Sequence, residues 1–227
     1  KYPQWIKSSV FYQIFPDRFA KSKKTNKERR VPKNFVPRDW NALPKGKDRT
    51  TGIEYFGGDL DGVREHLDHI SDLGISGIYF TPFFPASSTH RYDASSFYKV
   101  DPLLGGDDAL ISLSKAAFKK GIRIMGDLTT NHCGAANPWI KRALKDRKSA
   151  EREFFYWDKT VPHGYEGWWG LASLPKLNYN SIKLRKLMWR SKSSVVRKWL
   201  RAPYNMAGWR IDVGNMTGRY KSDDLNR

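Results

Sequence analysis

The amino-acid sequence predicts an α/β fold with a parallel sheet. Short apolar runs alternate along the chain with segments in which apolar residues recur at helical spacing. Such alternation favours parallel strands joined by right-handed helical crossovers. In addition, Asp127 and Asp212 each lie near the end of a predicted strand. The carboxyl ends of parallel strands meet at one edge of a sheet, which is where α/β enzymes hold their chemistry.

Four strands are expected. The first is the run SVFYQIF at 9–15, which is bounded by Pro16. The other three are ISGIYFTP at 75–82, IRIMGDL at 122–128 and MAGWRIDV at 206–213. All are short, apolar and separated by polar segments, as buried strands are.

Three helices are expected between these strands. In 59–74 the apolar residues have helical spacing, and Gly74 is a plausible stop. The second helix, 107–121, opens with acids and closes with lysines, as the helix dipole favours. The third covers 181–201. The polar stretch 16–58 is predicted to be a long loop.

Alternation along a strand assigns its side chains to two faces. The residues of the fourth strand that are expected to face the helices are Trp209, Ile211 and Val213, and those expected to face the interior are Gly208, Arg210, Asp212 and Gly214. In the third strand, Ile122, Ile124 and Leu128 share one side, and Asp127 lies on the other. The two aspartates are therefore predicted to converge at the rim of the sheet.

Composition limits the kind of protein. The 227 residues are 39% hydrophobic and include 9 Trp, 11 Tyr and 12 Phe, which is enough for a sizeable core. No apolar run approaches the roughly 20 residues that span a membrane, so no membrane partner is expected. The single cysteine, Cys133, excludes an internal disulfide and fits a reducing compartment. We therefore expect a cytoplasmic globular protein.

The chain is strongly basic, with 41 Lys+Arg against 23 Asp+Glu and a net charge of +18. Such a charge attracts polyanions. However, the basic clusters at 21–30, 141–148 and 182–201 contain no recognition helix, RNA-binding aromatic platform or zinc finger. We interpret them as solvated surface charge and expect no nucleic-acid partner.

Several motifs resemble those of one enzyme family. DLTTNH (127–132) and GWRIDV (208–213) resemble the first and second signatures of the α-amylase family of retaining α-glycoside hydrolases. LPKLN (174–178) resembles an additional signature of that family. HRYD (90–93), VFYQIFPDRF (10–19) and YFGGDL (55–60) resemble its maltodextrin glucosidase and cyclomaltodextrinase branch. The motifs follow the order of the family over nearly the whole chain.

The resemblance implies a (β/α)8 TIM barrel, of which 1–227 would be about the first four β/α units. The segment 133–180 would be a small loop-rich subdomain between the third strand and the third helix. The substrate implied is an α-1,4-linked maltooligosaccharide.

The resemblance also implies roles for individual residues. Asp212 would be the catalytic nucleophile, and Arg210 beside it would pair with it and keep it ionised. His132 would hydrogen-bond hydroxyls of the sugar, Tyr92 would stack on the sugar ring, and Asp127 would organise the same pocket. Taken alone, however, an Arg-x-Asp pair on a strand is more often a structural ion pair, and His132 and Tyr92 are more often ordinary packing residues.

A structural calcium ion is the one cofactor that the resemblance suggests. Asn131 matches a position that binds calcium in some relatives. The loop AKSKKTNKERR (20–30), which in many relatives is rich in Asn and Asp, is cationic here and a poor calcium site. No other cofactor is expected.

The general acid/base is not expected within these residues. The family places a glutamate on the next strand, and Glu151, Glu153 and Glu166 all precede Asp212. We therefore expect the chain to be an N-terminal fragment, inactive by itself because leaving-group protonation needs that acid, and prone to aggregation through its open sheet edge. Two alternatives remain at this point: a transglycosylase or isomerase of the same family, such as one forming trehalose, and a catalytically dead homologue.

Overall fold

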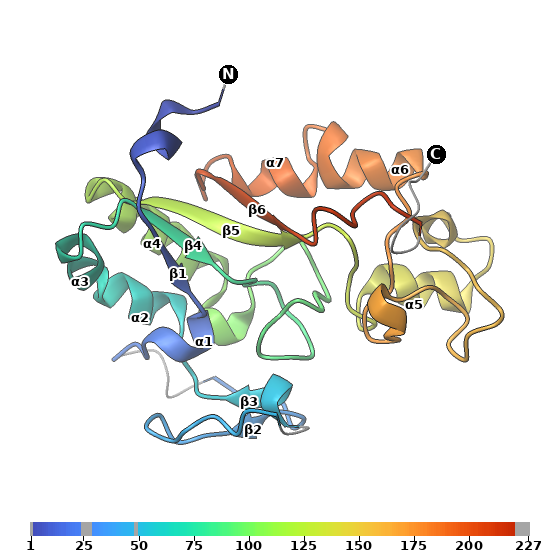
Figure 1. The fold of residues 1–227 in the computed structure, drawn as a ribbon, viewed down its shortest axis with the longest axis horizontal. Coiled ribbons are helices and arrows are strands. Elements are labelled where there is room, and N and C mark those ends of the chain that lie inside the picture. The colour runs from blue at the N-terminus through green and yellow to red at the C-terminus, as the bar shows by residue number, and fades with distance from the viewer. Residues whose placement is uncertain (1, 24–28, 48–49, 221–227) are drawn as a thin grey trace.

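The computed structural model describes residues 2–23, 29–47 and 50–220. Its centre is a four-stranded parallel sheet with the order β1-β4-β5-β6 (Figure 1). The strands are β1 (Phe11–Ile14), β4 (Gly77–Phe80), β5 (Arg123–Thr129) and β6 (Gly208–Asp212). The four predicted strands and their parallel arrangement are confirmed, although three of the strands are shorter than predicted.

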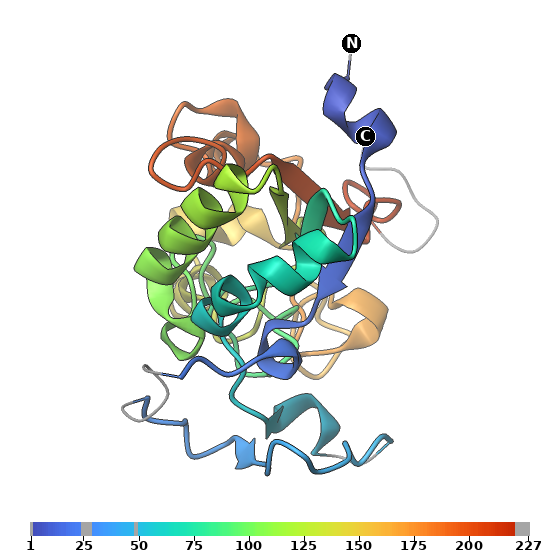
Figure 2. The same ribbon diagram turned by 90° about the vertical axis from the view of Figure 1, so that its left-hand side faces the viewer.

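Helices cover one face of this sheet. They are α2 (Leu60–Glu65), α3 (Leu67–Asp72), α4 (Gly106–Lys119) and α7 (Val195–Trp199). Figure 2 shows α2 and α3 in teal and α4 in green along one side of the strands. The indole of Trp209 on β6 donates to the Val196 carbonyl at 3.2 Å, which attaches α7 to the same face.

The covered face holds the main hydrophobic core. Its strand side chains are at most 3% exposed; they are Ile14, Ile78, Phe80, Ile124 and Leu128. Trp209 also points to this face and stacks on Phe83 at 6.1 Å between ring centroids, as predicted. Ile211 lies opposite Leu128 and so is also on the predicted face, although it is 43% exposed because β6 is an edge strand. The prediction does not hold for Val213, which lies beyond the strand with φ of 49°.

The opposite face of the sheet is open in the described part of the chain. Its exposed side chains are Phe11 and Gln13 on β1, Arg123 on β5 and Arg210 on β6. Tyr79 and Met125 lie between them on β4 and β5 and are half-buried. Asp127 and Asp212 belong to this face, so the predicted functional residues line a surface that the helices leave free.

The predicted helix 59–74 is divided in two. Its apolar face was predicted correctly, since Leu60, Val63, Leu67 and Ile70 are almost completely buried. The break is at His66, whose φ of −111° and ψ of 16° are not helical. The His66 ring lies 2.8 Å from the Gly62 carbonyl, a local hydrogen bond that competes with helix continuation.

The predicted helix 181–201 is also interrupted. It consists of α6 (Ile182–Arg185), one π-helical turn η6 (Lys186–Arg190) and α7. The hydroxyl of Ser191 donates to the Lys186 carbonyl at 2.7 Å and ends the turn. Serine hydroxyls often compete with helical hydrogen bonds in this way.

The described part of the predicted loop 16–58 contains four short elements. They are α1 (Pro16–Phe19), β2 (Val36–Pro37), η2 (Thr51–Ile53) and β3 (Glu54–Tyr55). The pair β2-β3 lies apart from the main sheet in both views (Figures 1 and 2). The buried Asp17 accepts from the backbone of Phe56 and Gly57 at 3.1 and 3.0 Å, which ties the two ends of the loop together.

The segment 133–180 lies beyond the carboxyl ends of β5 and β6, in yellow to orange in Figure 1. It contains α5 (Pro138–Lys145), η4 (Ala150–Phe154) and η5 (Trp168–Gly170). Single β-bridges join its parts, for example His132 with Lys176 and Phe155 with Leu177. The other elements in the described residues are η1 (Gln4–Ser8) and η3 (Pro102–Leu104).

Candidate functional site

Asp127, Arg210 and Asp212 form one cluster at the carboxyl ends of β5 and β6. The sheet register places Asp127 opposite Arg210 and Thr129 opposite Asp212. Arg210 Nη1 donates to Asp127 Oδ2 at 2.9 Å and also bonds Asp212 Oδ1. The predicted pairing of Arg210 with Asp212 is therefore present, and the same guanidinium also bridges to Asp127.

Burial dominates the electrostatics of Asp127. Its side chain is fully buried, and burial raises the pKa of its carboxyl to about 6, against the opposing effects of Tyr79 and Arg210. Burial also disfavours the charged form of Arg210, but the charges of Asp127 and Asp212 outweigh this and raise the guanidinium pKa. The arginine therefore stays charged and faces both carboxylates.

Two tyrosines complete the hydrogen bonding of Asp127. Tyr79 on β4 and Tyr92 both donate from their hydroxyls to Asp127 Oδ2, the latter at 3.2 Å. Burial and the nearby carboxylate raise the pKa of Tyr92 to about 12, so its phenol remains a donor. Sequence reasoning missed Tyr79. The signal was present, because strand alternation puts Tyr79 on the face opposite its buried neighbours Ile78 and Phe80.

The loop that holds Tyr92 is anchored by its neighbour Arg91. This arginine is completely buried, adopts φ of 62° and pairs with Asp101 at 2.8 Å. The His90 ring lies 5.8 Å from the Tyr92 ring on the other side. The contacts of Arg91 and His90 therefore fix the position of Tyr92, whose hydroxyl is also hydrogen-bonded to Asp127.

His132 is fully buried and stacks on a tryptophan. Its ring is parallel to that of Trp168 within 12°, with centroids 5.3 Å apart. Burial lowers the pKa of His132 to about 4, and the Tyr92 backbone opposes this only in part. Its Nε2 has no well-formed hydrogen-bond partner among the described residues. The ring is thus neutral near pH 7, with one polar atom left for another group.

Asn131, next to His132, binds a buried lysine. Lys176 Nζ donates to Asn131 Oδ1 at 2.6 Å and to the Met216 carbonyl at 3.1 Å. Burial lowers the pKa of Lys176 to about 8, and Glu166 opposes the effect. The sequence drew attention to Lys176 only as part of LPKLN and attached no role to it.

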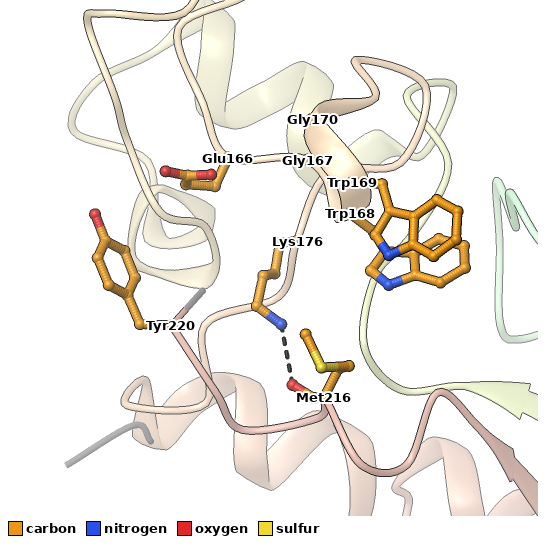
Figure 3. A pocket seen from close by; sticks show the side chains of 8 residues that line it. All are labelled: Glu166, Gly167, Trp168, Trp169, Gly170, Lys176, Met216 and Tyr220. Carbon is orange, nitrogen blue, oxygen red and sulfur yellow. Dashed lines mark hydrogen bonds between the residues drawn. The ribbon is translucent and has the colours of Figure 1, made fainter. Parts of the chain in front are cut away.

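A hollow of about 240 Å³ lies beside this lysine. Figure 3 shows its lining side chains, with the Trp168 and Trp169 rings side by side and the Lys176 ammonium directed to the Met216 carbonyl. Trp169 is 79% exposed and has φ of 53°, which is unusual for a bulky residue. The cluster of Asp127, Arg210 and Asp212 is not part of this lining.

The structure thus brings together the residues singled out from the sequence. Tyr92, Arg210 and Asp212 meet at or near Asp127, and the Tyr92 backbone also adjoins His132. Asn131 joins the group through His132, since its amide nitrogen is 3.3 Å from His132 Nδ1. Tyr79, Trp168 and Lys176 are the additions that the fold supplies.

Comparison with known proteins identifies one family. The model of the α-amylase catalytic domain matches residues 13–225. A cyclomaltodextrinase of Geobacillus thermopakistaniensis is 36% identical, with 94% of this chain and 34% of the relative covered. An intracellular maltogenic amylase of Bacillus subtilis is 34% identical over the same shares of the two chains. The chain spans about a third of the length of these curated relatives.

Solved structures of glycoside hydrolases also resemble this chain. A cyclic α-maltosyl-(1→6)-maltose hydrolase from Arthrobacter globiformis matches with a TM-score of 0.79 and 32% identity, covering 95% of this chain and 46% of that one. The type III pullulan hydrolase from Thermococcus kodakarensis matches with a TM-score of 0.80 and 30% identity, covering 94% and 39%. The four parallel strands are therefore part of a (β/α)8 barrel.

In the described ranges, no helix combines the length and apolarity needed to cross a membrane.

Proposed function

Because this chain belongs to the family of α-amylase catalytic domains, we propose that the protein containing it hydrolyses α-1,4-glucosidic bonds of maltooligosaccharides with retention of configuration. Asp212 is the proposed nucleophile. Its carboxylate would attack the anomeric carbon, form a covalent glycosyl-enzyme and later release the sugar to water. The printed names of the relatives, cyclomaltodextrinase and maltogenic amylase, support a substrate of linked glucose units.

The observation that supports this proposal most directly is the bridge from Arg210 to Asp212 and Asp127. A nucleophilic carboxylate must be ionised and fixed in direction, and a bound guanidinium provides both. Asp212 is 9% exposed, whereas Asp127 is completely buried and its Oδ2 is already shared by Tyr79, Tyr92 and Arg210. Asp212 is therefore the carboxylate that a substrate can reach, and Asp127 organises it.

His132 and Tyr92 are the proposed partners of the sugar that is cleaved. The free Nε2 of His132 can hydrogen-bond a sugar hydroxyl, which would satisfy an otherwise costly buried polar atom. The ring of Tyr92 offers a flat apolar face, and the bond from its hydroxyl to Asp127 holds that face in place.

The segment 133–180 is proposed to form one wall of the substrate cleft. Trp168 stacks on His132, and Trp169 continues the stack at 5.1 Å between centroids while remaining mostly exposed. An exposed indole held on a strained backbone suits stacking against a further glucose unit of the chain. The other aromatic residues of 153–170 mostly pack in the core, as Phe154, Phe155 and Tyr165 do.

We propose that the general acid/base is a glutamate outside the strands described here. Asp127 cannot take this role, because Tyr79, Tyr92 and Arg210 already bond its Oδ2. The 227 residues alone are then expected not to hydrolyse glucan, since nothing would protonate the leaving oxygen.

A cytoplasmic location is proposed on the single cysteine and on the Bacillus subtilis relative named as intracellular.

The test uses the complete product of the gene that encodes this chain. Asp212→Ala should lower kcat on maltotriose by about 10⁶-fold, the order lost when a nucleophile is removed. The exposed Asp72→Ala is the matched control and should keep wild-type activity. A 5-fluoroglucosyl fluoride should label the wild type on the peptide containing Asp212. Unchanged hydrolysis by Asp212→Ala, or a label on another peptide, would refute the assignment.

The same enzyme preparation also tests the alternative activities, transglycosylation and isomerisation. Products of the wild type on maltotriose separate hydrolysis, which yields maltose and glucose, from transglycosylation, which yields longer sugars, and from isomerisation, which leaves the size unchanged. All three use the same nucleophile, so the Asp212 result stands apart from this choice.

A further inference from the structure

The position at Asn131, where the family resemblance suggests calcium, does not fit a divalent cation in this protein. Its side-chain oxygen already accepts a 2.6 Å hydrogen bond from Lys176 Nζ. The Met216 carbonyl, a second oxygen at the same place, accepts from the same ammonium at 3.1 Å. Residues 2–23, 29–47 and 50–220 contain no group of three or more His, Cys, Asp or Glu side chains able to hold a metal ion. Part of the cationic loop 20–30, residues 24–28, lies outside the described residues.

A calcium ion and the Lys176 ammonium exclude each other at this position because both are positively charged. Calcium binds six to eight oxygen ligands, commonly including carboxylates. Here the oxygens that accept hydrogen bonds from the Lys176 ammonium belong to an amide and a backbone carbonyl, and the one carboxylate whose charge acts on this ammonium, that of Glu166, is already balanced by it. A divalent ion at those oxygens would meet a like charge only a few ångströms away, beside a side chain that is 4% exposed. This side chain is that of Lys176, and its ammonium is held at both oxygens by hydrogen bonds.

The ammonium joins three separate parts of the chain. Asn131 follows β5, Lys176 belongs to the segment 133–180, and Met216 follows β6. The backbone reinforces the first of these contacts, because Leu177 N donates to the Asn131 carbonyl at 2.9 Å and Cys133 N to the Pro175 carbonyl at 3.1 Å. We propose that Lys176 is a built-in cation that takes the place of a metal ion and, through Asn131, positions His132.

The chemistry of the three groups determines how His132 is held. An ammonium has only donors, so the Asn131 amide must turn its oxygen toward Lys176. The amide nitrogen then faces His132 Nδ1 at 3.3 Å and donates to it. A neutral imidazole that accepts at Nδ1 has its proton on Nε2. Lys176 thereby selects the tautomer in which the buried Nε2, which has no well-formed partner among the described residues, is a donor.

This tautomer matters for substrate binding, a consequence that rests on the proposed function. A sugar hydroxyl near Nε2 would accept a hydrogen bond from His132 and remain free to donate elsewhere. The stack on Trp168 opposes a flip of the ring about its Cβ–Cγ bond, which would move both nitrogens away from their present positions. Neither the exclusion of a metal ion nor the tautomer of His132 depends on catalysis, so both can be tested without it.

The first measurement is the tautomer of His132, by ¹⁵N NMR of the complete gene product labelled at histidine. In the wild type, Nε2 should be protonated and Nδ1 unprotonated. Asn131→Asp should still fold, since the new carboxylate pairs with Lys176, but it offers no donor to His132. The proton should therefore move to Nδ1. An unchanged tautomer in Asn131→Asp would overturn the positioning role.

The second measurement is metal dependence of the wild type. Neither Ca²⁺ nor a chelator should change the midpoint of thermal unfolding, and Tb³⁺ should give no emission sensitised by Trp168 beside the site. A calcium-induced rise in the midpoint that is lost in Asn131→Ala would overturn the built-in cation. Because neither measurement uses hydrolysis, loss of the proposed function and loss of this inference are distinguishable.

Lys176→Met separates charge from packing. It keeps the length of the side chain and removes the ammonium, so the His132 tautomer should become mixed. Lys176→Arg restores a cation and should recover the wild-type tautomer. If Lys176→Met does not fold, the Asn131→Asp and metal measurements still decide the proposal.

Discussion

Arg210 on β6 donates to Asp127 on the neighbouring strand β5 at 2.9 Å with the same nitrogen that contacts Asp212. The guanidinium is 44% exposed, whereas Asp127 is completely buried. One cation thus spans the rim between two strands and holds the accessible carboxylate of Asp212 against a buried anchor.

Arg210→Lys should lower kcat on maltotriose by about 100-fold, the order expected when one preorganised electrostatic contact is lost. A lysine ammonium is a point charge and cannot bridge the two carboxylates with the fixed planar geometry of a guanidinium. Steady-state kinetics of the complete gene product provide the measurement. The exposed Arg197→Lys is the control and should be unaffected. Wild-type kcat in Arg210→Lys would contradict the bridging role.

Asp127 should make stability depend on pH. Burial raises its pKa from 3.8 to about 6 in the folded state. Between these values the unfolded chain has lost the proton and the folded chain retains it. The contribution of protonated Asp127 to the free energy of unfolding is therefore complete below about pH 3.8. It is lost as the pH rises to about 6, which lowers the free energy of unfolding by up to about 3 kcal/mol. Urea unfolding of wild type and Asp127→Asn at pH 4 and 6.5 measures it.

The groups that face Asp127 decide how that result is interpreted. They are Tyr79 on β4, Tyr92 on its loop, and Arg210 and Asp212 on β6. Both tyrosines and the arginine keep their protons between pH 4 and 6.5, because the pKa of each is raised. Asp212→Asn should retain the pH slope that Asp127→Asn loses. Equal slopes in wild type and Asp127→Asn would show that burial does not raise this pKa.

Trp169→Ala should weaken oligosaccharide binding without destabilising the protein. The side chain is 79% exposed, and exposed substitutions usually change the free energy of unfolding by less than about 0.5 kcal/mol. Loss of one aromatic stacking contact should weaken the affinity for longer maltooligosaccharides by up to about tenfold. Calorimetric titration of maltotriose and maltohexaose into Asp212→Ala, with and without Trp169→Ala, measures this. Leu171→Ala, which is also exposed, should bind normally.

Gly134→Ala should destabilise the protein by about 2 kcal/mol or more. A Cβ there would lie 2.1 Å from the Asp93 carbonyl oxygen, so the start of 133–180 would be pushed from the loop that holds Tyr92. Gly214→Ala is the control, because its Cβ would meet only ordinary contacts at 3.6 Å or more. The midpoint of urea unfolding distinguishes the two. Equal midpoints would show that the close approach at Gly134 is not required.

Local patterns predicted the strands and most of the faces. Alternation along a strand has a period of two, so the opposite placement of Asp127 and Leu128 follows from adjacency alone. The helices were less predictable. The spacing of Leu60 and Ile70 identified a buried face, but it contained no information on the break at His66, which depends on a side-chain hydrogen bond.

By itself, the sequence determined the order of strands and helices, the location of two aspartates at one sheet edge, and a set of motifs that pointed to the α-amylase family. Only the tertiary structure decided the surroundings of those residues. Tyr79 reaches Asp127 across 48 positions and Lys176 reaches Asn131 across 45. Such contacts depend on where distant loops return to the sheet, and that position is set by the packing of the whole core, not by any short pattern of residues.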